Sequence, residues 1–221
     1  MPAPEASPVV ILGAGGHAKV VIEILRDSRP DLRLVGLLDA DPSPRSLLGA
    51  EVIGDDSRLP GLRREGVAKA FVAVGDNRRR EALGVNLQEM GFELVKAVSP
   101  RACVSPSARL GSGVAVMAGA VVGAEAELLD LVIVNTGALV DHECRLARAA
   151  HVAPGCALAG RVSVGERALL GVGVSVVPGA SIGADAVVGA GSCVISDIPA
   201  GVVAKGLPAR PGEALPRGDL A

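Results

Sequence analysis

Apolar residues recur with a period of six along more than half of the chain. From Val98 to Val194 every sixth residue is Val, Leu or Ile, and the residue four positions later is Ala, Val, Cys or Ser in every repeat as far as Ser192. Neither a helix with 3.6 residues per turn nor a strand with a period of two produces this pattern. A strict short repeat predicts a solenoid, in which each unit buries its apolar face only by stacking on its neighbours.

Six residues make one flat side of a coil, so three repeats close a triangle of about eighteen residues and the series predicts roughly five to six coils. Stacked coils pair as parallel strands about 4.8 Å apart. The first residue of each repeat points inward, and the small residue four positions later lies near a corner. Glycine often follows the inward residue, which predicts a bend where a Cβ would obstruct the chain; these glycines are Gly111, Gly123, Gly165, Gly171, Gly183 and Gly189.

Residues 9 to 97 have a different pattern, in which short apolar runs alternate with charged, helical segments. We expect strands at 9–12, 34–38, 71–74 and 93–97, with helices from the glycine turn to about residue 27 and from 77 to about 90. Alternating strands and helices predict a small parallel α/β sheet of the Rossmann-like type. The expected organisation is a flexible tail (1–8), an α/β domain (9–97), a β-helix domain (98–199) and a C-terminal extension (200–221) that covers or trails from the last coil.

Composition narrows the function classes. The formal net charge is −2, which argues against binding nucleic acid or a charged membrane surface. No apolar stretch is long enough to span a membrane, so we expect a cytoplasmic protein. The cysteines have no metal-binding spacing, and we interpret all of them as reduced structural thiols, with no bound metal; they are Cys103, Cys144, Cys156 and Cys193.

A glycine-rich turn follows the first expected strand. Gly13, Gly15 and Gly16 precede a helix, and Asp39 ends the second strand, a spacing that favours phosphate binding at the helix N-terminus. Binding of a whole NAD is less favoured, because fewer than a hundred residues are available and no reductase domain follows. His17 either contacts phosphate or sugar or is an ordinary first-turn residue.

The next strand end adds polar residues at the same edge of the sheet, where ligands of parallel sheets bind. Together with Asp39, these residues are candidates for holding the base, ribose and phosphates of a nucleotide: Asp41, Gly75, Asp76, Asn77 and Arg80. Asp76 or Asn77 equally fits the role of a helix cap.

Two histidines lie on the predicted prism at positions that do not point inward. His142 stands between Asp141 and Glu143, and either carboxylate would orient an imidazole that acts as a general base. A surface histidine between two acids is also common. Asn135 adds a polar group nearby, and His151, taken alone, fits a surface histidine with a satisfied hydrogen bond.

Five segments carry a family resemblance: GAGGHAKV, LLDADP, VGDNRRR, NTGALVDHEC and the closing GLPAR. Together with the sixfold repeat, they resemble the hexapeptide-repeat sugar acetyltransferases of the PglD and NeuD type, including GDP-perosamine N-acetyltransferase, over residues 9 to 210. The resemblance implies a left-handed parallel β-helix that binds acetyl-CoA at a subunit interface, an N-terminal domain that binds a nucleotide sugar, and a homotrimer. Asp130 departs from the family pattern at one turn.

The resemblance also assigns roles to residues. His142 matches the catalytic histidine, with Glu143 as its partner and Asn135 nearby, and His151 matches a histidine that contacts the acetyl group. An amine of the sugar would attack the thioester while His142 takes its proton, and Gly155 or Gly160 would donate to the oxyanion. Acetyl-CoA would lie near Gly160, the segment from Gly171 and Gly173 to Val174, and Ala190, with Lys205 or Arg210 at its phosphates.

Other functions stay open at this point. A sugar O-acetyltransferase differs only in its acceptor, and a trimeric scaffold would bind a nucleotide sugar without consuming acetyl-CoA. Carbonic anhydrases built on similar prisms need three metal-binding histidines, whereas this prism carries two. Sugar nucleotidyltransferases need a basic, glycine-rich transfer loop that this sequence lacks.

Overall fold

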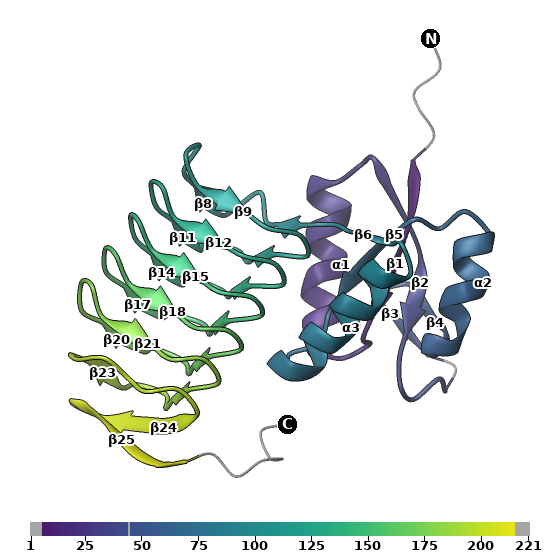
Figure 1. Cartoon of the computed structure of the whole chain (residues 1–221). Helices are drawn as coiled ribbons and strands as arrows, with labels where there is room; N and C mark the ends of the chain where they lie inside the picture. The colour runs from purple at the N-terminus through teal and green to yellow at the C-terminus, as the bar shows by residue number, and fades with distance from the viewer. Residues whose placement is uncertain (1–5, 44, 215–221) are drawn as a thin grey trace.

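The structure, a computed structural model, describes residues 6–43 and 45–214. It has an α/β part and a triangular prism that lie side by side (Figure 1). The expected tail at 1–8 lies mostly outside the described residues, although Ser7 and Pro8 already belong to the first strand. The predicted boundary before Val98 falls inside the first strand of the prism.

The α/β part is a six-stranded sheet in the order β3-β4-β2-β1-β5-β6, parallel except for the pair β3–β4. Its strands are β1 (Ser7–Leu12), β2 (Leu32–Leu38), β3 (Ser46–Leu47), β4 (Ala50–Gly54), β5 (Lys69–Val72) and β6 (Glu93–Leu94). The helix α1 (Gly16–Ser28) packs on one face, and α2 (Leu59–Arg64) and α3 (Asn77–Glu89) pack on the other. A 3₁₀ turn, η1 (Asp56–Arg58), follows β4. The predicted parallel sheet is confirmed.

The prism has coils of eighteen residues, as predicted, because each strand pairs with the strand eighteen residues later, for example Ala115 with Ile133. We name its faces in chain order. The first face holds β7 (Ala97–Val98), β10 (Ala115–Val116), β13 (Ile133–Val134), β16 (His151–Val152), β19 (Leu169–Leu170) and β22 (Val187–Val188). The second face holds β8 (Cys103–Val104), β11 (Val121–Val122), β14 (Leu139–Val140), β17 (Ala157–Leu158), β20 (Ser175–Val176) and β23 (Cys193–Val194). The third face holds β9 (Arg109–Leu110), β12 (Glu127–Leu128), β15 (Arg145–Leu146), β18 (Ser163–Val164) and β21 (Ser181–Ile182).

The inward positions form the core of the prism. From Val116 to Val194 every inward residue is at most 4% exposed. The three inward residues before them, Val98, Val104 and Leu110, are only partly buried, because no coil lies above them. At the other end, β24 (Val202–Gly206) and β25 (Ala209–Ala214) form a hairpin that extends the first face and covers the last coil. The C-terminal extension therefore covers the prism as far as residue 214.

The corners turn through a left-handed residue, three positions after each inward residue, from Gly113 to Gly191. One corner, which we call the glycine edge, has glycine in five successive coils after the first: Gly119, Gly137, Gly155, Gly173 and Gly191. The histidine edge carries Glu125, Glu143, Arg161 and Gly179, and the domain edge carries Gly113, Leu131, Ala149, Arg167 and Asp185. The glycines predicted to mark the bends lie two residues earlier. At Gly123 an added Cβ would lie 2.7 Å from the Asp141 carbonyl carbon, so these glycines allow coils to stack rather than to turn.

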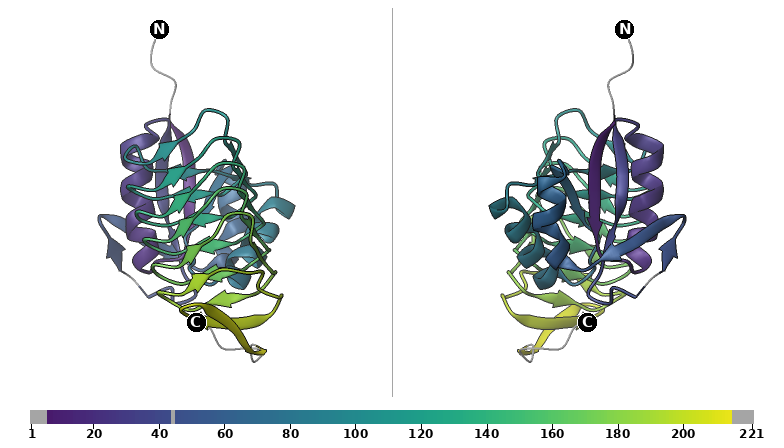
Figure 2. Two further views of the ribbon diagram at one scale, coloured as in Figure 1. Left: turned by 90° about the vertical axis from the view of Figure 1, so that its left-hand side faces the viewer. Right: turned by 90° about the vertical axis from the view of Figure 1, so that its right-hand side faces the viewer.

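The α/β part covers the first face and the domain edge, and Figure 2 shows this from both sides. Ala115, Met117 and Ile133 join the apolar cluster of α1. On the domain edge, Leu131 packs against α3 so closely that a Cβ at Gly84 would lie 2.5 Å from its Cδ1 atom. The second and third faces stay uncovered by the α/β part.

Candidate active site

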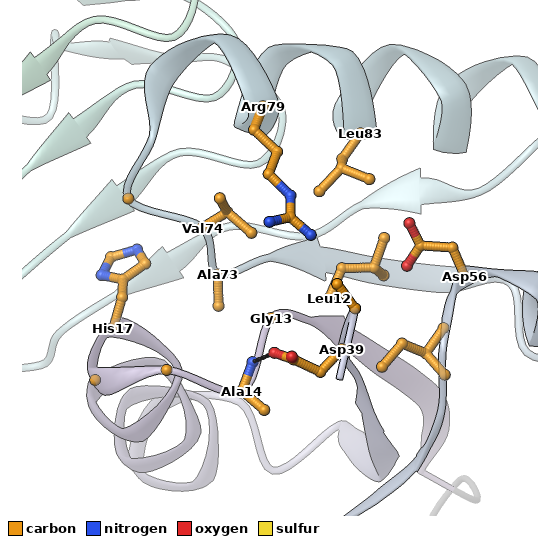
Figure 3. A pocket seen from close by; sticks show the side chains of 15 residues that line it. Leu12, Gly13, Ala14, His17, Asp39, Asp56, Ala73, Val74, Arg79 and Leu83 are labelled. Atoms are coloured by element: carbon orange, nitrogen blue, oxygen red, sulfur yellow. Dashed lines mark hydrogen bonds between the residues drawn. The ribbon is translucent and has the colours of Figure 1, made fainter. Parts of the chain in front are cut away.

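A pocket of about 350 Å³ opens at the carboxyl edge of the α/β sheet (Figure 3). Six of the predicted substrate residues line it: Gly13, Gly15, Gly16, His17, Asp39 and Gly75. The sequence therefore located this pocket.

The geometry of the glycine turn, Gly13 to Gly16, suits the binding of an anion. Gly13 has φ +103°, and a Cβ there would lie 2.6 Å from the Ala73 carbonyl oxygen, so no other residue fits. Gly15 caps α1 without a side-chain hydrogen bond, and no acid lies in the first turn. The free N–H groups and the positive end of the helix dipole therefore face the pocket and suit a phosphate group.

Asp39 organises this turn. Its carboxylate accepts hydrogen bonds from the Ala14 amide at 2.7 Å and the Asp41 amide at 3.0 Å, and it pairs with Arg45 at 3.1 Å. Burial alone would raise the pKa of Asp39, but these hydrogen bonds and the Arg45 charge outweigh burial and hold the pKa below its usual value. The Asp41 side chain bonds Ser43 and lies outside the pocket.

Three predicted substrate residues have other partners. Asp76 caps α3, because its Oδ1 atom accepts from the Arg79 amide at 2.6 Å. Arg80 is 1% exposed and donates to the Leu131 and Ala149 carbonyls of the domain edge, at 2.9 and 2.7 Å. Arg80 also donates at 2.7 Å to Asn77, whose own amide donates to the Arg167 carbonyl at 2.8 Å.

Arg80 and Asn77 therefore hold the α/β part to the prism, and neither lines the pocket. The physical reason is helix rotation. Successive residues of a helix point about 100° apart, so three consecutive arginines of α3 face three directions. Arg78 pairs with Asp185 on the prism, Arg79 reaches into the pocket, and Arg80 is buried between the parts.

The sequence interpretation missed Arg79 and Asp56, which both line the pocket (Figure 3). The helical period of the Arg78–Arg80 run would have singled out Arg79. No such signal existed for Asp56, because β4 and η1 were not predicted. Burial raises the pKa of Asp56, and the positive charge of Arg79 opposes the shift.

Two histidines, His17 on the pocket wall and His151 on the first face of the prism, have strongly lowered pKa values. Desolvation and the Arg80 charge lower the pKa of His17 to about 4 and that of His151 to about 3. The His151 Nε2 atom lies 3.1 Å from the Asn135 amide nitrogen. The Nε2 atom of His17 is buried without a hydrogen-bond partner among the described residues. Of these residues, His17 lines the pocket, whereas His151 and Asn135 lie on the prism, with His151 close enough for the His17 charge to lower its pKa further.

His142 lies elsewhere, on the histidine edge. Its Nδ1 atom is 2.9 Å from Glu143 Oε2, and its ring is stacked on Gly160, where an added Cβ would lie 2.4 Å from Nε2. Asp141 is occupied by the His142 backbone amide at 2.7 Å. Of the two flanking acids, Glu143 is therefore the partner of the imidazole, and the Nε2 atom stays available.

The remaining predicted residues lie along the prism. Gly171 permits coil stacking, because a Cβ there would lie 2.7 Å from the Ala190 nitrogen, whereas Gly173 is open to solvent on the glycine edge. Lys205 and Arg210 are paired across the final hairpin. Among the described residues all four cysteines are free thiols. Within the described ranges no group of three or more His, Cys, Asp or Glu side chains is placed to hold a metal ion, and no helix is long and apolar enough to cross a membrane.

Known proteins resemble this chain in sequence and in fold. The PglD N-terminal domain family matches residues 8–86. PerB of Caulobacter crescentus, solved with CoA and GDP-perosamine, is 54% identical with a TM-score of 0.89, and the alignment covers 96% of this chain and 99% of PerB. Two further structures are variants of the same enzyme in which one histidine is replaced. The acetyltransferase domain of PglB from Neisseria gonorrhoeae, solved with acetyl coenzyme A, is 38% identical with a TM-score of 0.86 over 93% of this chain and 99% of that domain.

The curated relatives match over part of their length. UDP-N-acetylbacillosamine N-acetyltransferase of Bacillus subtilis is 40% identical over 112 residues, which is 50% of this chain and 51% of that enzyme. A match to an uncharacterised protein of Acanthamoeba polyphaga mimivirus spans only 20% of that protein. The PerB likeness, in contrast, extends over nearly the whole of both chains. The chain therefore belongs to the PglD-type family of sugar N-acetyltransferases, with a left-handed parallel β-helix after a Rossmann-like domain.

Proposed function

We propose that this protein transfers the acetyl group of acetyl-CoA to the amino group of a nucleotide-linked amino sugar, with His142 as general base. The observation that carries the proposal is the His142–Glu143 pair, whose Nδ1 to Oε2 distance is 2.9 Å. Glu143 accepts a hydrogen bond from Nδ1–H, which leaves the lone pair on the Nε2 atom. That atom takes the proton that the attacking amine must lose, a contribution of roughly 10²–10⁴ in rate.

The developing oxyanion needs a donor near the base. The Gly155 amide already donates to the Thr136 carbonyl at 3.0 Å. Gly160 lies beneath the His142 ring, and its amide makes no backbone hydrogen bond among the described residues. Of the two glycines considered from the sequence, Gly160 is therefore the better oxyanion donor.

The nucleotide sugar occupies the pocket at the sheet edge. Its diphosphate lies at the N-terminus of α1, beside Gly15 and Gly16, and Arg79 supplies a positive charge. The hexose extends past His17 of the pocket toward His151 and Asn135 of the prism. His151 is the residue that contacts the acetyl group.

A pocket and a base from the same chain lie on different sides of the prism. The α/β part packs on the first face and the domain edge, whereas His142 lies on the histidine edge, between the second and third faces. We infer that His142 of one copy acts on a sugar held by another copy, in a homotrimer. Acetyl-CoA lies along the uncovered prism near Gly171, Gly173 and Ala190, with Lys205 and Arg210 at its phosphates. Because acetyl-CoA and nucleotide sugars are cytoplasmic metabolites, we place the enzyme in the cytoplasm.

Two co-expressed variants test both the base and the shared site. His142→Ala removes the base, and Gly16→Asp adds a carboxylate at the phosphate position without a clash, since nothing lies within 4 Å of a Cβ added at Gly16. Each variant alone is expected to lose at least 100-fold in thiol release from acetyl-CoA with amino-sugar nucleotides. Mixed trimers are expected to regain part of the activity, because some sites combine two intact halves. An active His142→Ala enzyme contradicts the base assignment, and mixed trimers without activity contradict the shared site.

A further inference from the structure

The carboxyl ends of four strands lie in a row along the nucleotide pocket. In the sheet order β4-β2-β1-β5, the residues that follow these strands and line the pocket are Asp56, Asp39, the glycine turn and Gly75. Neighbouring strands are about 4.8 Å apart. A nucleoside diphosphate with its phosphates at the glycine turn, as proposed above, therefore places its ribose near Asp39 and its base at the end of β4.

Two carboxylates line this row, those of Asp39 and Asp56. Asp39 already bonds the Ala14 and Asp41 amides and pairs with Arg45. The Asp56 carboxylate has neither a hydrogen bond nor an ion pair among the residues that the structure describes. Apolar walls from Leu12, Leu38 and Leu83 line the same pocket and suit the faces of a ring. Figure 3 shows Asp56 at the end of the pocket remote from His17.

An ionised carboxylate accepts hydrogen bonds and cannot donate them. Guanine presents two adjacent donors, N1–H and the 2-amino group, which match the two oxygens of a carboxylate. Uracil presents one donor, N3–H, between two carbonyl oxygens that a carboxylate repels. Adenine and cytosine place a ring-nitrogen acceptor beside their amino group. Guanine is therefore the base that an unpaired carboxylate selects.

We propose that Asp56 is a specificity-determining residue that reads the N1–H and 2-amino groups of a guanine base, so that the substrate is a GDP-linked amino sugar. The inference rests on the proposed function, because it assumes that the pocket holds a nucleotide. Arg79 has a different role in nucleotide binding. It enters the pocket from α3, on a different element from Asp56, and neutralises the diphosphate, which all nucleoside diphosphates share.

The test measures binding of free nucleotides by calorimetry, without catalysis. The wild-type protein is expected to bind GDP at least tenfold more tightly than inosine diphosphate, which lacks the 2-amino group, and more tightly still than UDP. In Asp56→Ala and Asp56→Asn the preference for GDP over inosine diphosphate is expected to fall to about one. Glu51→Gln, an exposed change of the same charge on β4, is the control and is expected to keep the wild-type ratio.

Arg79→Gln separates base reading from charge. It is expected to weaken GDP, inosine diphosphate and UDP by a similar factor, with the ratios unchanged. Equal wild-type affinity for GDP and UDP, or an unchanged GDP preference in folded Asp56→Ala, overturns the inference. Either result leaves acetyl transfer untouched, because thiol release with GDP-linked and with UDP-linked amino sugars measures that reaction separately. With a GDP-linked substrate, Asp56→Ala is expected to raise KM at least tenfold and to leave kcat within about threefold.

Discussion

Gly160→Ala tests whether the position of the His142 ring, and not only its presence, sets the rate. The added methyl carbon would lie 2.4 Å from Nε2 and 2.5 Å from Cε1. Non-bonded carbon contacts are most favourable at about 3.5–4.0 Å, so the ring has to retreat by about 1 Å. Retreat either breaks the 2.9 Å contact with Glu143 or forces a strained rotamer, which costs about 0.5–1.5 kcal/mol.

The expected outcome is a split between stability and rate. The free energy of unfolding changes by no more than about 1.5 kcal/mol, whereas a base displaced by about 1 Å lowers kcat on the order of 100-fold. The Gly160 amide is still present in the variant, so an oxyanion donor at this position is retained. Urea unfolding and thiol-release kinetics measure the two quantities.

Gly179→Ala is the control, because Gly179 lies on the histidine edge and its amide donates to the Gly160 carbonyl at 3.0 Å. Gly179 has φ +74°, so alanine strains the backbone by about 1–2 kcal/mol, but nothing lies within 4 Å of the added methyl group. We expect this variant to lose stability and to keep kcat within about threefold. A folded Gly160→Ala enzyme with near wild-type kcat would refute the reasoning, because the base would then not need the observed ring position.

Three further predictions concern the base, the contact between the two parts, and pH. Glu143→Gln is expected to lower kcat at least tenfold, while Glu125→Gln, the equivalent left-handed residue one coil earlier, leaves kcat unchanged; equal losses would show a general charge effect. Arg80→Met is expected to lower the unfolding free energy by at least about 3 kcal/mol, since the Leu131 and Ala149 carbonyls lose their donor. Its control, Arg78→Met, removes an exposed ion pair and costs about 1 kcal/mol or less, so similar urea midpoints for the two variants would contradict the role given to Arg80. The lowered pKa values of His17 and His151, about 4 and about 3, mean that the unfolded chain gains protons first as pH falls below 6.5. The contribution of these histidines to the free energy of unfolding is thus full above pH 6.5 and is lost toward pH 4, and this free energy changes by up to about 2.7 kcal/mol per pH unit. Urea midpoints at pH 7.5 and 5 measure the change. A double His17→Gln, His151→Gln variant with the same pH dependence as wild type would contradict the prediction.

The sequence predicted the prism well because every coil needs apolar residues at its inward positions. An inward residue that is polar or misplaced would leave a cavity or an unpaired group in a core only one side chain wide, so the repeat from Val116 to Val194 is strict. The segment between β2 and β5 was missed because its elements are short. The strands β3 and β4 have two and five residues, and α2 has six, too few to establish a period.

The sequence predicted the site residues whose position depends on the local backbone. It predicted less well the residues whose direction depends on how a helix is rotated about its axis. Gly13 and Asp39 follow directly from the strand, turn and helix pattern, and both line the pocket. Arg80 and Asn77 lie at the same strand end, but their direction depends on how α3 packs on the prism. A sequence pattern shows that a polar residue is near an edge and does not show which neighbour it faces.

Every coil of the prism has eighteen residues, so the register of each coil depends on all the coils before it. One residue inserted or deleted within the repeat would move every later inward side chain out of register, whereas a whole added coil would keep the register and lengthen the axis by about 4.8 Å. His142 and the Ala149 carbonyl that accepts the hydrogen bond from Arg80 belong to the same coil. Coils gained or lost beyond Val176 would therefore change the length of the molecule, while the height of His142 relative to the pocket at the sheet edge would stay the same.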